Sequence, residues 1–121
     1  MGNILDGIDK KTLIAKFETF ILQKKAFLQQ TLTLEDVATQ LGISKNILSA
    51  VINAHFEANF NTIVNSYRVE HAKYLLINKR STPILDIGYE SGFNSKSSFY
   101  SAFKKFTRKT PIEFKNCVRN N

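Results

Sequence analysis

Most of the net positive charge of this chain lies in one segment of its sequence. The 121 residues carry a formal charge of +7, and the segment from Lys96 to Arg119 holds seven basic residues against one acid, Glu113. That segment therefore carries +6, whereas the first 95 residues carry +1. A basic block on a helical pattern indicates a polyanionic partner, either nucleic acid or an anionic membrane surface. The alternative is a solvated basic face that keeps the protein in solution.

The other chemically active residues lack the spacing that catalysis or metal binding needs. His55 and His71 stand sixteen residues apart without cysteine or carboxylate partners at ligand spacing, so we expect no metal site. Ser44 and Ser95 have no histidine and aspartate arranged to activate them. The acidic residues are interpreted as residues in the first turn of a helix or on a solvated face, not as a general acid–base pair: Glu35, Asp36, Asp86 and Glu90. We therefore expect no enzyme activity and no cofactor.

The composition is that of an ordinary globular domain, with 43% hydrophobic and 22% charged residues. The single cysteine, Cys117, excludes an internal disulfide and is expected to be a small packing residue of the last helix. No apolar run approaches the roughly 20 residues of a membrane span, and no signal-peptide core is present. These features predict a cytoplasmic protein.

Apolar residues recur at three and four positions, which predicts an all-α fold of seven helices. The expected helices cover 10–25, Thr33 to Gly42, a segment capped by Ser44, 59–78, Pro83 to Gly92, a segment capped by Ser95, and one opened by Thr110–Pro111. Pro83 is expected at the first helical position, after a cap. The phenylalanines at helical spacing are expected to be mainly core: Phe17, Phe20, Phe27, Phe56, Phe60, Phe99, Phe103 and Phe106.

The chain contains an internal repeat. Residues 34–43 align with residues 84–93, and the helices that follow align at an offset of fifty-one, so that Leu48 matches Phe99. Each copy reads as a helix-turn-helix. Gly42 and Gly92 stand where the first helix ends in a left-handed residue.

Within each copy the closest approach of the two helices is expected at a small residue, Ala38 in the first and Gly88 in the second. The weakest position of the second copy is Ser91, where the first copy has Leu41. Two such copies in 121 residues are a much stronger signal than one.

The sequence resembles the AraC/XylS family of transcription regulators over about residues 32–115. The resemblance rests on the run IGYESGFNSKSSF at 87–99, on Phe103-Lys104-Lys105, on Thr110-Pro111, and on NSYRVEHAKYLL at 65–76. It implies a DNA-binding unit of seven helices, in which a connecting helix joins two helix-turn-helix lobes. A connecting helix of about 19 residues is about 29 Å long, comparable with the roughly 34 Å of one duplex turn. Two recognition helices could then enter successive major grooves.

Three departures from the family pattern stand out. Gly88 replaces the usual alanine, which helix propensity disfavours by up to about 1 kcal/mol. Arg108 stands where a glycine usually precedes the last helix, so that turn is expected to differ or to carry strain. Residues 57–59 likewise lack the glycine usual after the first recognition helix.

The resemblance implies, position by position, which side chains face DNA. The base-reading residues would be Lys45, Asn46, Ser49, Ala50, Asn53, Lys96, Ser97, Tyr100 and Ser101. The phosphate contacts would be Ser44, Lys79, Arg80, Ser95, Lys104 and Lys105. Neither recognition helix carries an arginine among its base-reading residues, so we expect a site that leans toward A·T pairs. Arg68 is expected to form a structural ion pair with Glu35 or Asp36 instead.

The expected organisation is an N-terminal helix or linker segment at 1–30 followed by a DNA-binding domain at 31–121. That domain divides into lobe one at about 31–57, a connecting helix at about 59–79 and lobe two at about 81–118. The expected partner is double-stranded DNA, with RNA polymerase as a further partner and no membrane contact, in a longer chain with a sensor or dimerisation domain. The alternative is a helical protein-interaction module in which only the basic lobe two binds DNA, weakly or without specificity.

Overall fold

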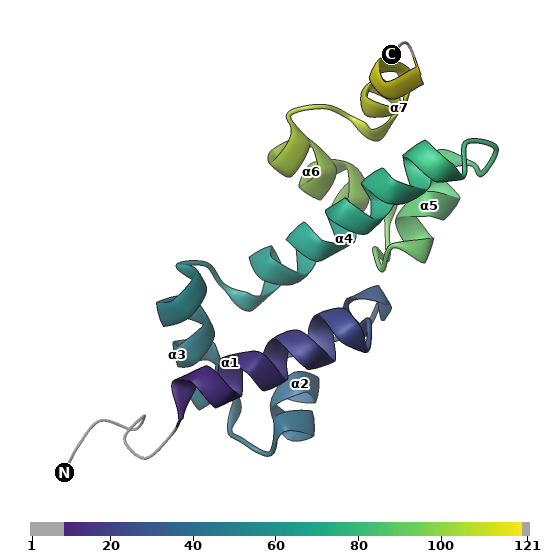
Figure 1. The fold of residues 1–121 in the computed structure, drawn as a ribbon. Helices are drawn as coiled ribbons and strands as arrows, with labels where there is room; N and C mark the ends of the chain where they lie inside the picture. Colours follow the sequence, from purple (N-terminus) through teal and green to yellow (C-terminus); the bar gives the residue numbers. More distant parts are fainter. Residues whose placement is uncertain (1–8, 120–121) are drawn as a thin grey trace. The chain divides into compact units, whose positions relative to one another are not determined.

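The computed structural model describes residues 9–119, and over that range the chain forms seven α-helices and no strand (Figure 1). The predicted all-α fold is thereby confirmed. The chain divides into two compact units. Unit 1 consists of the described residues up to Ala26 together with Leu32–Val64, and unit 2 consists of Phe27–Thr31 together with the described residues from Asn65 onward.

The first helix of unit 1 differs from its predicted extent of 10–25. It is α-helical over α1 (Lys10–Glu18), continues as a π-helical turn, η1 (Thr19–Gln23), and is followed by a short 3-10 turn, η2 (Ala26–Leu28). The N–H of Lys24 reaches back five residues to the carbonyl of Thr19. Lys25 then takes a left-handed backbone with φ 57°, which ends the helix.

The helix-turn-helix of unit 1 is built by local signals that the sequence makes visible. In α2 (Leu34–Leu41), Thr33 and Asp36 form a reciprocal capping box, and Gly42 closes the helix at φ 73°. The next helix is α3 (Lys45–Phe56), and α4 (Phe60–Asn78) begins in unit 1 and continues in unit 2.

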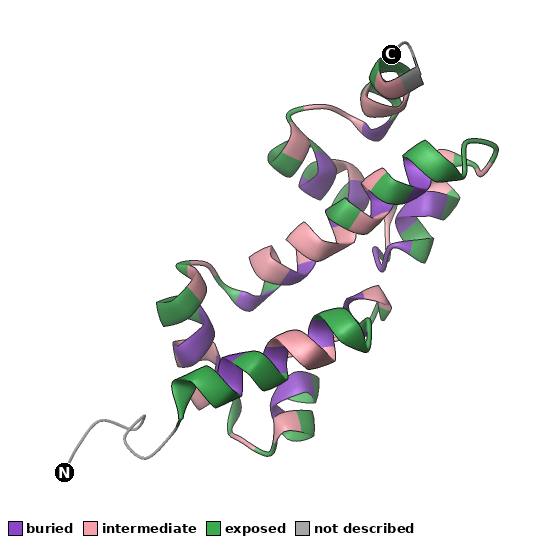
Figure 2. Cartoon of the chain, in the orientation of Figure 1, coloured by how far each residue is buried: buried purple, intermediate pink, exposed green. Residues whose placement is uncertain are grey.

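The core of unit 1 forms where α1 covers α2 and α3 (Figure 2). Phe17 is fully buried, with its ring centroid 5.9 Å from that of Phe56 and 6.4 Å from that of Phe60. Leu13 and Ile14 pack with Val51 of α3. Aromatic side chains of this size supply much of the apolar burial in a unit this small.

Unit 2 contains the rest of α4, α5 (Ile84–Glu90), α6 (Lys96–Thr107) and α7 (Pro111–Arg119). Its core holds three fully buried phenylalanines, Phe93, Phe99 and Phe103. A Cβ on Gly88 would lie 2.4 Å from the Phe99 ring, so the expected close approach of the two helices at Gly88 is confirmed.

Three residues of unit 2 lie differently from prediction. Pro83 is the N-cap of α5 rather than its first helical residue, because its ψ of 141° is extended. Phe106 is 39% exposed, since it lies in the last turn of α6 beyond the buried Phe103. Cys117 is exposed rather than packed, because α7 turns its other side inward.

The segment Phe27–Thr31 is bonded to unit 2, to which it belongs, although it precedes the helix-turn-helix of unit 1 in the sequence. Arg68 donates from Nε to the carbonyl of Phe27 and from Nη2 to that of Gln29, each at 2.7 Å. Its structural role is confirmed, but the predicted ion pair with Glu35 or Asp36 is wrong. Burial lowers the pKa of the Arg68 guanidinium from its ordinary value, and the two carbonyls replace the lost water.

Gly92 makes this arrangement possible. Its φ is +103°, and a Cβ there would lie 2.4 Å from the carbonyl oxygen of Phe27 and 2.7 Å from Nε of Arg68. The glycine is therefore required both by its left-handed backbone and by the close approach of the 27–31 segment. Gln30 adds a bond from Nε2 to the carbonyl of Tyr89, at 3.3 Å.

None of the helices within residues 9–119 has both the length and the apolar character needed to cross a membrane.

Candidate nucleic-acid interface

The two predicted recognition helices, α3 and α6, begin in the same way. Ser44 accepts a hydrogen bond from the N–H of Ile47 at 3.1 Å, and Ser95 accepts one from the N–H of Ser98 at 3.0 Å. Both predicted N-caps are confirmed. The Ser95 hydroxyl also donates to the Ser98 hydroxyl at 2.9 Å, so a bond from Ser95 to a phosphate requires that proton to change partner.

The outward face of α3 carries three of the predicted base-reading residues in one stripe. Asn46 and Asn53 are exposed, and Ala50 lies half-buried between them at helical spacing. The opposite face buries Leu48 and Ile52 in unit 1. The burial of one face therefore fixes the direction of the stripe, which presents two amides and a methyl group to solvent.

The remaining two predicted residues of α3 lie beside this stripe. Lys45 is exposed at the first residue of the helix. Ser49 is half-buried and lines a groove of about 390 Å³ together with Thr33 and Asn59. The side chain of Ser49 therefore lies at the margin of the outward face rather than at its centre.

The outward face of α6 repeats the stripe at the aligned positions. Ser97, Ser101 and Lys104 are exposed at helical spacing, while Phe99 and Phe103 are buried on the opposite face. The other two predicted residues lie together on the flank. Tyr100 is half-buried, and Nζ of Lys96 lies 5.3 Å from the centroid of its ring.

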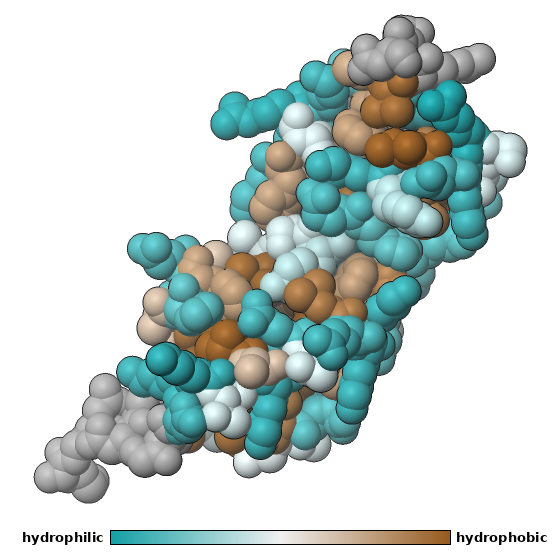
Figure 3. All heavy atoms as spheres, viewed as in Figure 1, coloured by the Kyte–Doolittle hydropathy of each residue, from teal (hydrophilic) through white to brown (hydrophobic). Residues whose placement is uncertain are grey.

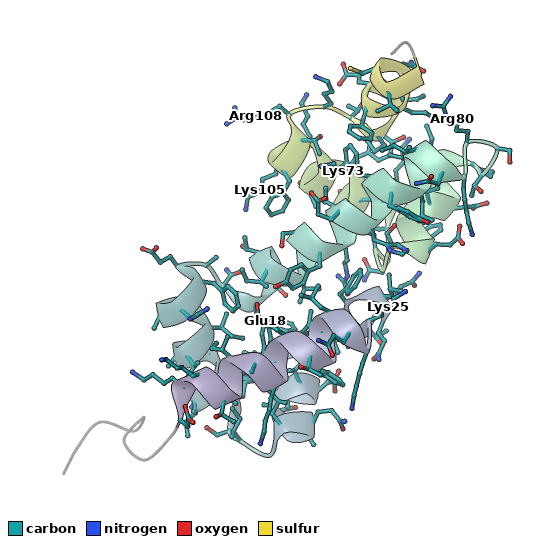
Figure 4. The ribbon with its side chains drawn as sticks, in the orientation of Figure 1. Glu18, Lys25, Lys73, Arg80, Lys105 and Arg108 are labelled. Carbon is teal, nitrogen blue, oxygen red and sulfur yellow. The ribbon has the colours of Figure 1, made fainter. Side chains whose placement is uncertain are left out.

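The predicted phosphate-contacting lysines of α6 lie at its C-terminal end. Lys104 and Lys105 are both exposed, and Nζ of Lys105 lies 5.7 Å from the centroid of the Phe106 ring. In Figure 3 the outer surface around the end of α6 is mostly hydrophilic. Figure 4 labels Lys105 and Arg108 at this end of the helix.

The other two predicted phosphate contacts, Lys79 and Arg80, follow α4 rather than α6. Both are exposed. Nε of Arg80 donates to the carbonyl of Ile77 at 3.4 Å, and the carbonyl of Arg80 accepts from Nζ of Lys115 at 2.7 Å. These bonds attach Arg80 to the end of α4 and to α7, so the structure does not bring it together with the α6 stripe.

Two residues that were not among the predicted DNA contacts follow the stripes. Glu57 follows α3 at φ 54°, and Arg108 follows α6 at φ 67°, so each ends its recognition helix in a left-handed backbone. Arg108 comes four residues after Lys104 and Glu57 comes four after Asn53, so each follows directly on the end of its outward stripe, although its left-handed φ gives the side chain another direction than a helical residue would have. The absence of the usual glycine at each position was the signal in the sequence. Of the two outcomes expected for the turn at Arg108, a different turn or a strained one, the structure shows a left-handed and therefore strained residue.

The electrostatic contrast between the stripes is large although their geometry matches. The α3 stripe runs Asn46, Ala50, Asn53, Glu57, and the α6 stripe runs Ser97, Ser101, Lys104, Arg108. The α3 stripe thus ends in an acidic residue, whereas the α6 stripe ends in two basic residues. Nowhere between residues 9 and 119 do three His, Cys, Asp or Glu side chains gather in a way that could hold a metal ion.

Comparisons with known proteins agree with this site. A family model described as a helix-turn-helix domain matches residues 37–116. The melibiose operon regulatory protein of Escherichia coli K12 is 29% identical over 86 residues, which cover 71% of this chain and 28% of that protein. An HTH-type transcriptional regulator of Staphylococcus aureus strain COL is 34% identical over 86 residues, which cover 71% of this chain and 11% of that protein. The chain thus matches only a small part of these longer relatives.

A solved structure gives the same assignment. The C-terminal domain of AraT, a response regulator from Geobacillus stearothermophilus, is 30% identical to this chain and superposes with a TM-score of 0.79. The alignment covers 87% of this chain and 84% of that domain. Sequence family and three-dimensional fold therefore point to one group of proteins.

Proposed function

This chain belongs to the AraC family of helix-turn-helix DNA-binding domains of transcription regulators, and from that membership we propose that α3 and α6 enter two successive major grooves of one duplex. The observation that supports this is the matched pair of exposed stripes, each opposite a buried face and each behind a serine N-cap. A helix displayed in this way is the element that helix-turn-helix proteins place in the major groove.

We assign the base-reading roles to the outward side chains. Asn46 and Asn53 pair with adenine edges, and Ala50 meets a thymine methyl group. On α6, Lys96 pairs with guanine, while Tyr100 meets a thymine methyl group. Ser49, Ser97, Ser101 and Lys45 complete the set.

The phosphate contacts are assigned to Lys104, Lys105, Lys79 and Arg80, together with the Ser44 and Ser95 ends of the helices. We place this chain in the cytoplasm, as part of a longer regulator. Its residues 31–121 form the DNA-binding domain, and a helical segment precedes them. A sensor or dimerisation domain and RNA polymerase are its proposed partners there.

The test is selection of bound duplexes from a randomised pool of about 30 base pairs at two salt concentrations. Two preferred elements about one helical turn apart are expected, each rich in A·T pairs. A single element would support the alternative module, in which only α6 reads DNA. Enrichment of guanine at every contacted step would refute the proposed base contacts. Loss of all binding at the higher salt, with no preferred sequence, would refute sequence-specific recognition.

The alternative has one observation in its favour. The outward stripe of α3 has no basic side chain and is followed by the acidic Glu57, so electrostatic attraction to the phosphate backbone adds little to its affinity for DNA. Single substitutions separate the two readings. Asn53→Ala is expected to relax specificity at one element if α3 reads bases, and to leave the selected sequence unchanged if α3 serves a protein partner.

A further inference from the structure

We propose that Arg108 contacts a DNA phosphate and anchors the C-terminal end of α6, an inference that rests on the proposed function. The backbone of Arg108 supplies the first observation. Its φ of 67° lies in the left-handed region, and its N–H closes the helix on the carbonyl of Lys104 at 2.8 Å. Glycine adopts this conformation at no steric cost because it has no Cβ, whereas the Cβ of arginine makes the same conformation unfavourable.

The second observation is that the side chain does nothing for the fold. Arg108 is exposed, and its guanidinium has no hydrogen bond, ion pair or ring contact with any residue the structure describes. Arg68, by contrast, uses its guanidinium to hold two main-chain carbonyls. Figure 4 shows Arg108 at the end of α6, directed away from the rest of unit 2. The guanidinium is therefore available to a partner outside the chain.

The third observation is position. Arg108 is the exposed residue that directly follows α6, four positions after Lys104, the last residue of the stripe of Ser97, Ser101 and Lys104. When this stripe faces a major groove, a long side chain at its end can reach the phosphates that border the groove. A guanidinium binds two phosphate oxygens at once and stays charged at all accessible pH values.

The first copy of the repeat provides a matched control within the same chain. Glu57 has a φ of 54°, and its N–H bonds to the carbonyl of Asn53 at 3.0 Å, so its backbone repeats that of Arg108. Its charge is opposite. A carboxylate at the corresponding place gains nothing from a phosphate, so the comparison of the two residues separates the effect of the left-handed backbone, which they share, from that of the charge, in which they differ.

The experiment compares Arg108→Gly, Arg108→Lys and Glu57→Gly with the unaltered 121-residue chain. Thermal unfolding is measured first, and both glycine variants are expected to unfold at higher temperature because the left-handed strain is removed. Affinity for a fluorescent 30-base-pair duplex is then measured across a salt series. Arg108→Gly is expected to bind several-fold more weakly, with the slope of log K against log salt reduced by about 0.9. Arg108→Lys should keep that slope, and Glu57→Gly should bind at least as tightly as the unaltered chain.

The proposal is overturned if Arg108→Gly binds with the affinity and salt slope of the unaltered chain, or if Glu57→Gly weakens binding equally. If the unaltered chain itself fails to bind any duplex, the proposed function falls and this contact falls with it. Binding by the unaltered chain together with an unchanged Arg108→Gly variant removes the contact alone. Because glycine suits the backbone, weak binding by Arg108→Gly cannot be ascribed to misfolding.

Discussion

Ser91 has an exposed fraction of zero, and its Oγ has no hydrogen-bond partner among the described residues. A buried hydroxyl that is left unpaired costs free energy, since it has given up water without replacement. We expect Ser91→Ala to raise the free energy of unfolding by about 1 kcal/mol in urea titrations. As a control, Ser95→Ala removes a working N-cap and should lower it by about 1 kcal/mol. A loss of stability in Ser91→Ala would contradict this account.

Much of the residue-scale detail was predictable where it depends on near neighbours in the sequence. The caps at Thr33, Ser44 and Ser95 and the left-handed Gly42 follow from side chains within four positions. The partners of Arg68 were not predictable, because its two carbonyls lie 41 and 39 residues away. The predicted burial of Cys117 and Phe106 was wrong for a related reason. Periodicity shows which face of a helix is apolar, but not how far along the helix a neighbouring element covers that face.

At the scale of the elements, the two copies of the repeat pack with different pairs of residues. The first has Ala38 and Leu48 at the positions where the second has Gly88 and Phe99. Because Phe99 is fully buried and its ring lies 5.2 Å from Phe93 and 5.8 Å from Phe103, it cannot move away from an added methyl group. In this structure the Phe99 ring therefore leaves no room for a Cβ at Gly88.

This explanation predicts a coupling between the two positions. Gly88→Ala is expected to lower the free energy of unfolding by about 2 kcal/mol despite its better helix propensity, because the new Cβ overlaps the ring. Phe99→Leu alone should also destabilise, by leaving a cavity. The double variant restores the arrangement of the first copy, and a double-mutant cycle should give a favourable coupling of at least about 1 kcal/mol. Additive losses would show that the two residues do not compensate each other.

The start of α7 predicts a dependence on pH. The N–H of Thr110 donates to Oε1 of Glu113 at 2.8 Å, and the N–H of Glu113 donates back to Oγ1 of Thr110 at 3.2 Å. The bond from Thr110 lowers the pKa of Glu113 below its ordinary value of 4.5. A carboxylate with a lowered pKa stabilises the folded chain above pH 4.5, and that contribution is lost as the pH falls through the lowered pKa.

The matching variant is Glu113→Gln, which does not titrate. Its deficit in the free energy of unfolding relative to the unaltered chain should be present at pH 7 and should shrink as the solution is acidified from pH 5 to pH 3. Urea titrations at each pH measure this difference, and the other carboxyl groups cancel because both proteins share them. Two curves that stay parallel over this range would show that the Thr110 bond does not matter for stability.

For the molecule as a whole, the uneven charge predicts which substitutions alter DNA binding. Lys104→Ala and Lys105→Ala are each expected to weaken binding to all sequences alike and to reduce the salt slope by about 0.9, with roughly twice that effect in combination. Lys11→Ala removes the same charge from an exposed position of α1, outside both stripes, and should leave the slope unchanged. Equal effects from Lys11 and Lys104 would mean that net charge alone governs binding. Filter binding over a salt series distinguishes these results.

The segment at 27–31 also has a consequence for how the protein is made. Its five residues belong to unit 2, although the chain then continues through residues 32–64 of unit 1. Arg68 and the turn at Gly92, which hold this segment, are translated later, Gly92 some 61 residues after Thr31. At roughly 5–20 residues per second, the segment waits about 3–12 s on the ribosome for its partners. Unit 1 can fold as soon as residue 64 has been synthesised. Unit 2 can fold only later, when its residues from Asn65 onward bind the segment 27–31, which was synthesised before them.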